Sequence, residues 1–261
     1  MDETEFAPRR AWLPEVRAQG MHWLRRAVDI VLPPACIACS EPVAESGALC
    51  ASCWSRLRLL ERPFCARLAL PFAYDIGEGA LSAEAIADPP PFQRLRAVAV
   101  YDALSGRIVQ GLKYHDRTDI ANSVGTMMAR VASEFVGAVD VVVPVPLHRR
   151  RLWQRRFNQS ALLAEAVAAA LGLQHEPQCL LRIRATRQQV GLKAAARADN
   201  VRGAFALAPG ARPAIAGRRV LMVDDVYTTG ATVKAATRAL LRGGAASVEV
   251  VVFARVVEGT D

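Results

Sequence analysis

The sequence lacks any apolar run long enough to cross a membrane. No uncharged apolar stretch reaches the ~18 residues that a membrane-spanning helix needs. The most apolar stretch near the start, residues 27–39, contains Asp29, Pro33 and Pro34, so it does not match the apolar centre of a signal peptide. We therefore expect a soluble, cytoplasmic protein with no membrane span.

A Walker-type phosphate motif, Gly-x-x-x-x-Gly-Lys-Ser/Thr, is also absent, so the sequence does not support an ATP-driven DNA motor. Internal repeats and low-complexity segments do not stand out. Of the 261 residues, 52% are hydrophobic and 22% are charged, which permits a packed core and argues against wholesale disorder. The length suits one large domain, or a large domain and a small one.

Acidic residues are outnumbered by basic ones. The chain has 33 Lys and Arg residues against 25 Asp and Glu residues, a net charge of +8. This balance favours an anionic partner, either nucleic acid or a polyphosphate. An Arg-rich proteome with many mildly basic proteins explains the charge equally well, so charge alone leaves both interpretations open.

Cysteine is scarce outside one region, because only Cys179 lies beyond Cys65. Four of the six cysteines form two Cys-x-x-Cys pairs with ten residues between the pairs: Cys36, Cys39, Cys50 and Cys53. In a cytoplasmic protein, such pairs indicate a zinc site rather than disulfides. Each tight turn presents two sulfurs, and two turns complete a tetrahedron at ~2.3 Å Zn–S. We expect a structural Zn²⁺ with no open position; four unrelated thiols or a redox pair are the alternatives.

The chain divides by composition into four parts. Residues 1–32 form a basic amphipathic segment, residues 33–70 a zinc ribbon, residues 71–92 a connector and residues 93–261 the main domain. In the main domain, short β-rich runs alternate with helical stretches, which predicts a parallel sheet flanked by helices. The expected strands are 96–101, 139–146, 218–225 and 247–256, and the expected helices are 104–113, 118–133, 158–172 and 231–244.

Two adjacent carboxylates, Asp224 and Asp225, end one of these strands and are followed by the stretch VYTTGAT. Parallel sheets bind ligands at the carboxyl ends of their strands, and the amides of a helix N-terminus bind phosphate. Carboxylates suit sugar hydroxyls rather than phosphate. The stretch therefore predicts a site for a phosphate and a vicinal diol, such as a ribose 5-phosphate group. A plain strand-to-helix turn capped by aspartate fits the tandem pair poorly.

Residues 220–232, VLMVDDVYTTGAT, resemble the 5-phosphoribosyl pyrophosphate (PRPP) signature of the type I phosphoribosyltransferases. From about Val31 to Val256 the chain is similar to the ComF family. The similar segments are LPPAC with the Cys-x-x-Cys pairs, GLKYHD, VPVPLHRRR, FNQSALLA, RATRQQVGLKAAARADNVRGAF and VVVFAR. The resemblance implies an α/β protein of type I phosphoribosyltransferase fold with a small N-terminal zinc ribbon, and a role in natural competence, the handling of imported DNA.

The resemblance also assigns site residues. Asp224 and Asp225 match the catalytic, ribose-binding acidic pair, and the 5-phosphate loop is Thr228, Thr229, Gly230, Ala231 and Thr232. The pyrophosphate loop spans Pro144–Arg149 and includes Pro146, Leu147, His148 and Arg149, with Lys113 as a further contact. Residues Arg184–Asn200 match a mobile loop over the ligand. Mg²⁺ is implied as well, because pyrophosphate normally arrives chelated.

Two positions depart from the family's pattern. Relatives often have Arg-Gly-Phe-Asn, but this chain has Arg156-Phe157-Asn158, so a glycine's backbone freedom is missing. Relatives also often have a further Cys-x-x-Cys, but here Cys65 is followed by Leu68. We therefore expect no second complete metal site.

The segment HRRRLWQRRFNQ, residues 148–159, mixes arginines with aromatic residues, which suits phosphate contact with base stacking. Arg151, Trp153 and Arg155 are the nucleic-acid candidates. A solvated basic loop that serves only pyrophosphate is the alternative.

Three functions compete at this stage. The protein could transfer phosphoribosyl from PRPP to an unknown acceptor, with pyrophosphate release. It could instead be a non-catalytic competence factor that binds single-stranded DNA, senses PRPP and contacts other competence proteins. Nucleotide salvage is the third; against it stand the lack of an amidotransferase domain and of a recognisable base pocket.

Overall fold

The structure, a computed structural model, describes residues 33–113, 118–184 and 203–257. The expected basic segment at 1–32 lies outside these residues, as does nearly all of the expected loop at Arg184–Asn200. No helix of the described part combines the length and the apolarity that crossing a membrane requires.

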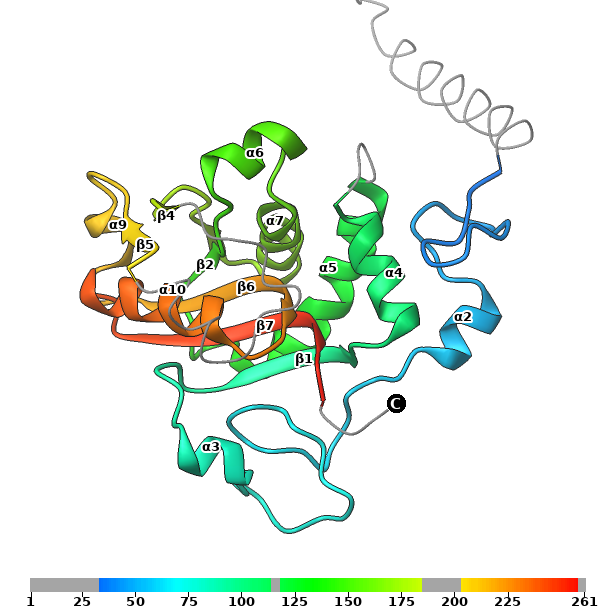
Figure 1. Cartoon of the computed structure of the whole chain (residues 1–261), viewed down its shortest axis with the longest axis horizontal. Helices are drawn as coiled ribbons and strands as arrows, with labels where there is room; N and C mark the ends of the chain where they lie inside the picture. Colours follow the sequence, from blue (N-terminus) through cyan, green and yellow to red (C-terminus); the bar gives the residue numbers. More distant parts are fainter. Residues whose placement is uncertain (1–32, 114–117, 185–202, 258–261) are drawn as a thin grey trace, which may run out of the picture.

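A five-stranded parallel sheet forms the centre of the main domain (Figure 1). Its strands lie in the order β1 (Leu95–Val100), β7 (Ser247–Arg255), β6 (Arg219–Tyr227), β2 (Val141–Pro144) and β3 (Gln174–His175). Every pair of neighbours is parallel. β2, β6 and β7 are valine-rich and buried along nearly their whole length, as strands covered on both faces must be. The predicted parallel sheet is confirmed.

Helices cover both faces of the sheet, and each face has its own core. α4 (Ala103–Gly111), α5 (Thr118–Ala132) and α7 (Gln159–Leu171), with the short helix η1 (Ser133–Phe135), pack on the side to which Leu221 and Val223 of β6 point. α10 (Ala231–Arg242) packs on the other side, against Val220 and Met222. Alternate residues of one strand thus enter opposite cores, as the period of a strand dictates.

Smaller elements lie outside the main sheet. α6 (Arg149–Arg155) follows β2, and β4 (Leu180–Arg182) pairs with β5 (Phe205–Leu207) in a separate antiparallel sheet, followed by α9 (Arg212–Ile215). A backbone bridge between His148 and Arg182 joins the start of α6 to β4.

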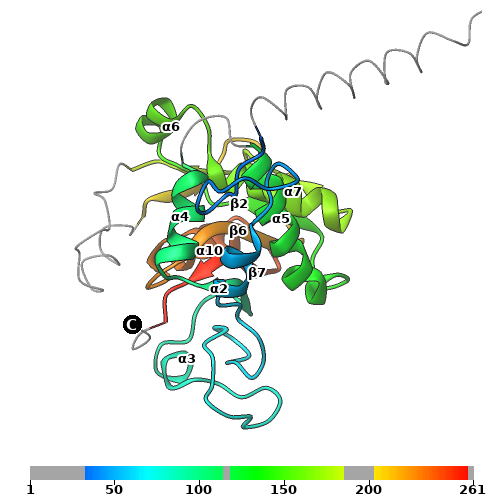
Figure 2. The ribbon, with the colours of Figure 1, turned by 90° about the vertical axis from the view of Figure 1, so that its right-hand side faces the viewer.

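Before the sheet, a small knuckle occurs twice, at residues 34–56 and 63–88 (blue and cyan in Figures 1 and 2). Backbone contacts recur in the same order in both copies. The matching pairs are the bridges Ala35–Pro42 and Phe64–Pro71, and the N–H···O bonds Cys36–Glu41 and Cys65–Leu70, and Ile37–Ala48 and Ala66–Ala80. This repeat was not apparent from the sequence.

Each copy ends in a short helix that begins in the same way. Cys50 caps α2 (Ala51–Arg56) by accepting from the Cys53 N–H, and Ser82 caps α3 (Ala83–Ala87) by accepting from the Ala85 N–H. The second copy crosses residue 70, where we expected the ribbon to end and a connector to begin. In both ribbon views α3 and α6 lie at opposite ends of the molecule (Figures 1 and 2).

Candidate functional site

A pocket of about 360 Å³ lies at the carboxyl ends of β2 and β6. This is the edge at which open parallel sheets bind ligands. It is lined by Lys113 after α4, residues 145–147 after β2, Arg151 and Arg155 of α6, Gln159 and Ser160 of α7, Arg182 of β4, residues 224–228 and residues 230–233.

The acidic pair of this pocket is held by the first turn of α7. Asp224 and Asp225 are only 8% and 9% exposed. Ser160 Oγ donates to Asp224 Oδ1 at 2.9 Å, and Gln159 Nε2 donates to Asp225 Oδ2 at 3.4 Å. One oxygen of each carboxylate thus has a side-chain donor from α7, which sets the direction in which the carboxylate faces the pocket.

The surroundings of Asp224 oppose its ionisation. Burial, followed by the negative charge of Asp225, raises the pKa of Asp224 to about 8. The Ser160 hydroxyl, the Asp225 N–H and the charge of Arg182 all oppose this rise. Asp224 is therefore largely protonated at neutral pH without a ligand, and a ligand that donates hydroxyl hydrogens would favour its ionised form.

The loop between β6 and α10 is shaped for an anion. Gly230 caps α10 with φ of +73°, and the cap has no side-chain hydrogen bond to the helix. A Cβ at Gly230 would lie 2.1 Å from Tyr227 Oη, so only glycine lets the loop pass this close to the tyrosine. Thr229 Oγ1 is buried without a hydrogen-bond partner in the described part of the chain. The N-terminus of α10 therefore offers donors to a phosphate.

Four cationic side chains line the pocket: Lys113, Arg151, Arg155 and Arg182. Lys113 Nζ lies 3.8 Å from Asp225 Oδ2, and Arg155 Nη1 donates to Gln159 Oε1 at 3.4 Å. Two of the cations are thus tied directly or through one side chain to the acidic pair. Their number suits a ligand with several negative charges.

Most residues that the resemblance assigns to PRPP line this pocket: Lys113, Pro146, Leu147, Asp224, Asp225, Thr228, Gly230, Ala231 and Thr232. Thr229, His148 and Arg149 are not among its lining residues. His148 instead caps α6, with its Nδ1 accepting from the Arg150 N–H at 3.3 Å.

The three nucleic-acid candidates lie on different sides of α6. Arg151 and Arg155 are four positions apart and face the pocket. Trp153 is 86% exposed and lines a shallow hollow on the outer side with Arg149, Leu152, Gln154 and Arg156. The arginines and the tryptophan therefore do not form one surface.

Gln159, Ser160 and Arg182 line the pocket but were not among the site residues expected from the sequence. The first two lie in the segment FNQSALLA, but their direction depends on how α7 docks on β6. Arg182 comes from β4, a strand of three residues that gives no periodic signal. The only related expectation from the sequence was that a helix would begin at residue 158, after the strand expected at 139–146.

The loop between α6 and α7 contains no glycine, yet one of its residues has the left-handed backbone conformation that glycine favours. Arg156 ends α6 in the left-handed conformation, with φ of +64°. A non-glycine residue in this region costs roughly 1–2 kcal/mol. Asn158 then caps α7 and donates through Nδ2 to Val145 O at 3.1 Å, which fixes the loop against the end of β2.

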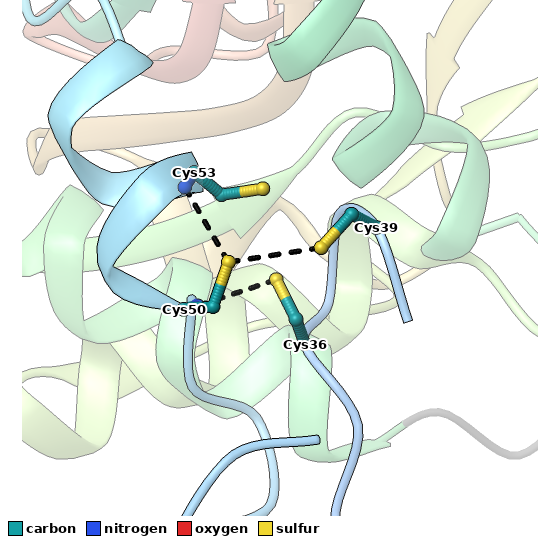
Figure 3. Close-up of side chains that lie close together, drawn as sticks. All are labelled: Cys36, Cys39, Cys50 and Cys53. Atoms are coloured by element: carbon teal, nitrogen blue, oxygen red, sulfur yellow. Dashed lines mark hydrogen bonds between the residues drawn. The ribbon is translucent and has the colours of Figure 1, made fainter. Parts of the chain in front are cut away.

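The four cysteines of the first knuckle come together as predicted. Their sulfur atoms all lie within 4.8 Å of one another (Figure 3). Cys39 Sγ and Cys50 Sγ are 3.7 Å apart, near the ~3.8 Å that 2.3 Å zinc bonds at tetrahedral angles require. Backbone N–H groups of Cys50 and Cys53 donate to Cys36 Sγ and Cys50 Sγ, as thiolate ligands favour. The donor set fits a structural zinc ion.

The second knuckle retains only one of these ligands. Cys65, Leu68, Ser82 and Ala85 stand where the first copy has Cys36, Cys39, Cys50 and Cys53. Ser82 N donates to Cys65 Sγ at 3.2 Å, just as Cys50 N donates to Cys36 Sγ at 3.3 Å. Cys65, Leu68 and Ala85 are buried in the apolar core. Among the described residues, only the first knuckle gathers a metal-binding set.

Comparison with known proteins agrees with both parts of the structure. A family model described as "Double zinc ribbon domain" matches residues 27–86, and one described as "Phosphoribosyl transferase domain" matches residues 158–261. The chain is 35% identical to the DNA utilization protein YhgH of Salmonella typhimurium, over 85% of this chain and 96% of that protein.

Two competence proteins are more distant relatives. Competence protein F of Haemophilus influenzae is 25% identical over 82% of this chain and 92% of its own length. Competence protein ComFC of Bacillus subtilis is 26% identical over 77% of this chain and 81% of its own length.

The fold and the two matched domains define a type I phosphoribosyltransferase fold with an N-terminal zinc-ribbon domain. Within that class, the chain belongs to the ComF family, which confirms the resemblance noted in the sequence.

Proposed function

We propose that this protein binds PRPP in the pocket at the ends of β2 and β6 and acts in the use of imported DNA. The observation that carries the proposal is the meeting of three features in one pocket: the buried acidic pair, the open N-terminus of α10 and four cations. The names of the relatives, DNA utilization protein and competence protein, support the proposed role in the use of DNA.

Each feature suits one part of PRPP. The ribose hydroxyls would donate to Asp224 and Asp225, and the 5-phosphate would accept from the loop at Thr228–Thr232. The pyrophosphate would face the cationic side chains, with Lys113 beside Asp225. Mg²⁺ would arrive chelated by the pyrophosphate. In the pocket, the polyphosphate and the carboxylate pair together would offer the oxygen ligands that Mg²⁺ prefers.

If turnover occurs, an acceptor nucleophile attacks the anomeric carbon while the bond to pyrophosphate breaks. The cations would stabilise the charge that develops on the leaving group, and the acidic pair would hold the ribose in place. Both are electrostatic and orienting contributions that need no covalent step on the protein.

The direct test is calorimetric titration of PRPP with Mg²⁺ into the wild type and into Asp224→Asn/Asp225→Asn. We expect binding to the wild type and loss of binding in the double variant, with the apoprotein still folded. The matched control is Asp140→Asn, an aspartate at the amino end of β2 that pairs with Arg219 at 2.6 Å, far from the pocket edge of the sheet. Wild-type affinity in the double variant would remove the acidic pair from the site.

A second proposed activity is weak binding of single-stranded DNA on the outer side of α6. Trp153 is 86% exposed there and Leu152 is 40% exposed, beside Arg149 and Arg156. An exposed aromatic ring stacks on any base, and arginines contact phosphates, so little sequence preference is expected.

Fluorescence anisotropy at several salt concentrations tests this surface. For single strands the log–log slope is about −0.7 per neutralised phosphate, so Arg149→Ala/Arg156→Ala should make the slope shallower by about 1.4. Trp153→Ala should weaken binding by ~1–3 kcal/mol with little change of slope. Arg151→Ala/Arg155→Ala is the matched control, because these arginines face the pocket. A larger effect of the control pair would place the DNA inside the pocket instead.

A further inference from the structure

The second knuckle raises the question of what fixes it to the main domain without a metal ion. Two buried arginines reach it from the sheet. Arg96 of β1 is 5% exposed and donates through Nη1 to Ala66 O at 3.0 Å. Arg255, the last residue of β7, is 1% exposed and donates through Nη1 to Leu68 O. Both arginines therefore bind carbonyl groups of the same turn, residues 65–69.

Only one of the two arginines also contacts Tyr227, the residue that precedes the phosphate loop. Tyr227 and Arg255 are register partners on β6 and β7, and the Arg255 guanidinium lies 4.8 Å from the centre of the Tyr227 ring. Phe92 packs against the same ring edge-on, with centroids 6.2 Å apart. Tyr227 itself is fully buried. Its ring is thus held between a cation and a second aromatic ring.

The other end of the Tyr227 side chain supports the loop. The tyrosine oxygen lies so close beneath Gly230 that a Cβ there would be 2.1 Å away. Gly230 is the N-cap of α10, where the amides that would hold a phosphate begin. A continuous line of contacts therefore runs from the metal-free knuckle through Arg255 and Tyr227 to the phosphate loop.

We propose that Arg255 is a positioning residue for the loop 228–232, and that the metal-free second knuckle holds Arg255 in place. The proposal rests on the proposed function, because it takes the loop to bind the 5-phosphate of the ligand. Leu68 O and Glu84 Oε2, 3.4 Å from Arg255 Nη2, fix the guanidinium. The guanidinium holds the Tyr227 ring in place, and the ring in turn determines where the backbone of Gly230 can lie. The positive charge of Arg255 is also separated from the expected phosphate dianion only by the Tyr227 ring.

The test separates the phosphate loop from the rest of the pocket by using two small ligands. Ribose 5-phosphate probes the loop and the acidic pair, and pyrophosphate with Mg²⁺ probes the cations. Both are titrated calorimetrically into the wild type, Arg255→Met and Arg96→Met. We expect Arg255→Met to weaken ribose 5-phosphate binding about tenfold and to leave pyrophosphate binding within about twofold. Arg96→Met, which removes the other arginine's hydrogen bond to the knuckle together with its ion pair to Glu134, should change neither.

Glu84→Ala keeps the test valid if Arg255→Met does not fold. The Glu84 side chain is 47% exposed, and its loss removes only one contact of the Arg255 guanidinium. We expect about two- to threefold weaker ribose 5-phosphate binding and unchanged pyrophosphate binding.

Two results would overturn the proposal while the proposed function stands. One is wild-type affinity for ribose 5-phosphate in every folded variant of Arg255 and Glu84. The other is an equal loss in Arg96→Met, which would mean that loosening the knuckle in general is enough. If the wild type bound neither ligand, the proposed function itself would fail, and this proposal with it.

Discussion

Ser160 Oγ donates a hydrogen bond of 2.9 Å to Asp224 Oδ1, and this contact joins the start of α7 to the end of β6. The carboxyl group that accepts this hydrogen bond is buried and belongs to a residue that lines the pocket. Because the pair Asp224 and Asp225 is buried at this joint, the site carries an electrostatic cost that a ligand can relieve. Two predictions follow from that cost.

The first concerns stability. The folded-state pKa of Asp224, about 8, lies above its unfolded value, so the folded state binds the proton more tightly. Stability should therefore fall as pH rises from about 4 to about 8, and level off above it. Asp224→Asn removes this loss and should raise the apoprotein's Tm at pH 8.5 by at least about 2–4 °C, for about 1 kcal/mol. Thermal melts at pH 5 and pH 8.5 measure it; a variant less stable than wild type at pH 8.5 contradicts it.

The second concerns ligand affinity. Ribose hydroxyls donate to carboxylates, so binding favours the ionised form of Asp224. PRPP affinity should rise with pH up to about 8 and then level off. The measurement is calorimetric titration at pH 7, 8 and 9, a range in which the phosphates of PRPP are already ionised. Asp224→Asn should abolish both the tight binding of PRPP and the increase of its affinity with pH. An affinity that is flat over this range in the wild type would speak against titration of Asp224 in the site.

The third concerns the phosphate loop. Gly230→Ala should weaken ribose 5-phosphate binding strongly, because the new Cβ would lie 2.1 Å from Tyr227 Oη and displace the loop. Gly210→Ala is the matched control: its φ of +77° resembles the +73° of Gly230, but nothing lies within 4 Å of its Cβ position. Both variants should lose about 1 kcal/mol of stability through the strained backbone. Only Gly230→Ala should lose the ligand. Equal affinity in the two variants would show that the close contact with Tyr227 is not needed.

The main features of the fold were predictable from the sequence. Valine-rich strands and alternating helices carry strong periodic signals, and the four strands expected in the main domain are all present. The boundaries followed hydrogen bonding instead. The strand expected at 139–146 ends at Pro144; Val145 N still donates to Val223 O on β6, and Pro146 then has no N–H to continue the ladder. The strand expected to end at Asp225 runs on to Tyr227, because β7 continues beside it as far as Arg255.

What the sequence did not reveal depends on contacts between distant segments. The second knuckle repeats the backbone hydrogen bonds of the first but keeps only Cys65 of the four ligand positions, so the sequence showed an incomplete Cys-x-x-Cys pair and not a repeated fold. Ser160 and Arg182 reach the acidic pair and its pocket only because α7 and β4 dock there. The division of α6 into a pocket side and an outer side likewise needs the packing of the helix.

The fourth prediction concerns the metal. Purified protein should contain about one zinc per chain, held by the first knuckle. Elemental analysis should find it lost in Cys36→Ser/Cys50→Ser. Ile37 of this knuckle and Leu57, the residue directly after it, pack into the core beside α5, so metal loss should expose residues 34–56 to proteolysis and lower the Tm. Cys179→Ser is the control, a buried cysteine outside the knuckles. Full zinc retention in the double variant would assign the metal elsewhere.

The fifth prediction asks whether the second knuckle still has the geometry of a zinc site. Its turn and its helix cap are formed by the same kinds of hydrogen bond as those of the first knuckle. Ser82 N already donates to Cys65 Sγ at 3.2 Å. The variant Leu68→Cys/Ser82→Cys/Ala85→Cys restores all four ligand positions, and zinc content should rise from about one to about two per chain. The double variant Leu68→Cys/Ser82→Cys is the control, since three thiols hold the ion more weakly and leave a position open. Elemental analysis after gel filtration decides between them. A folded triple variant with one zinc would show that the apolar core around Leu68 and Ala85 has moved these positions too far apart to close a tetrahedron.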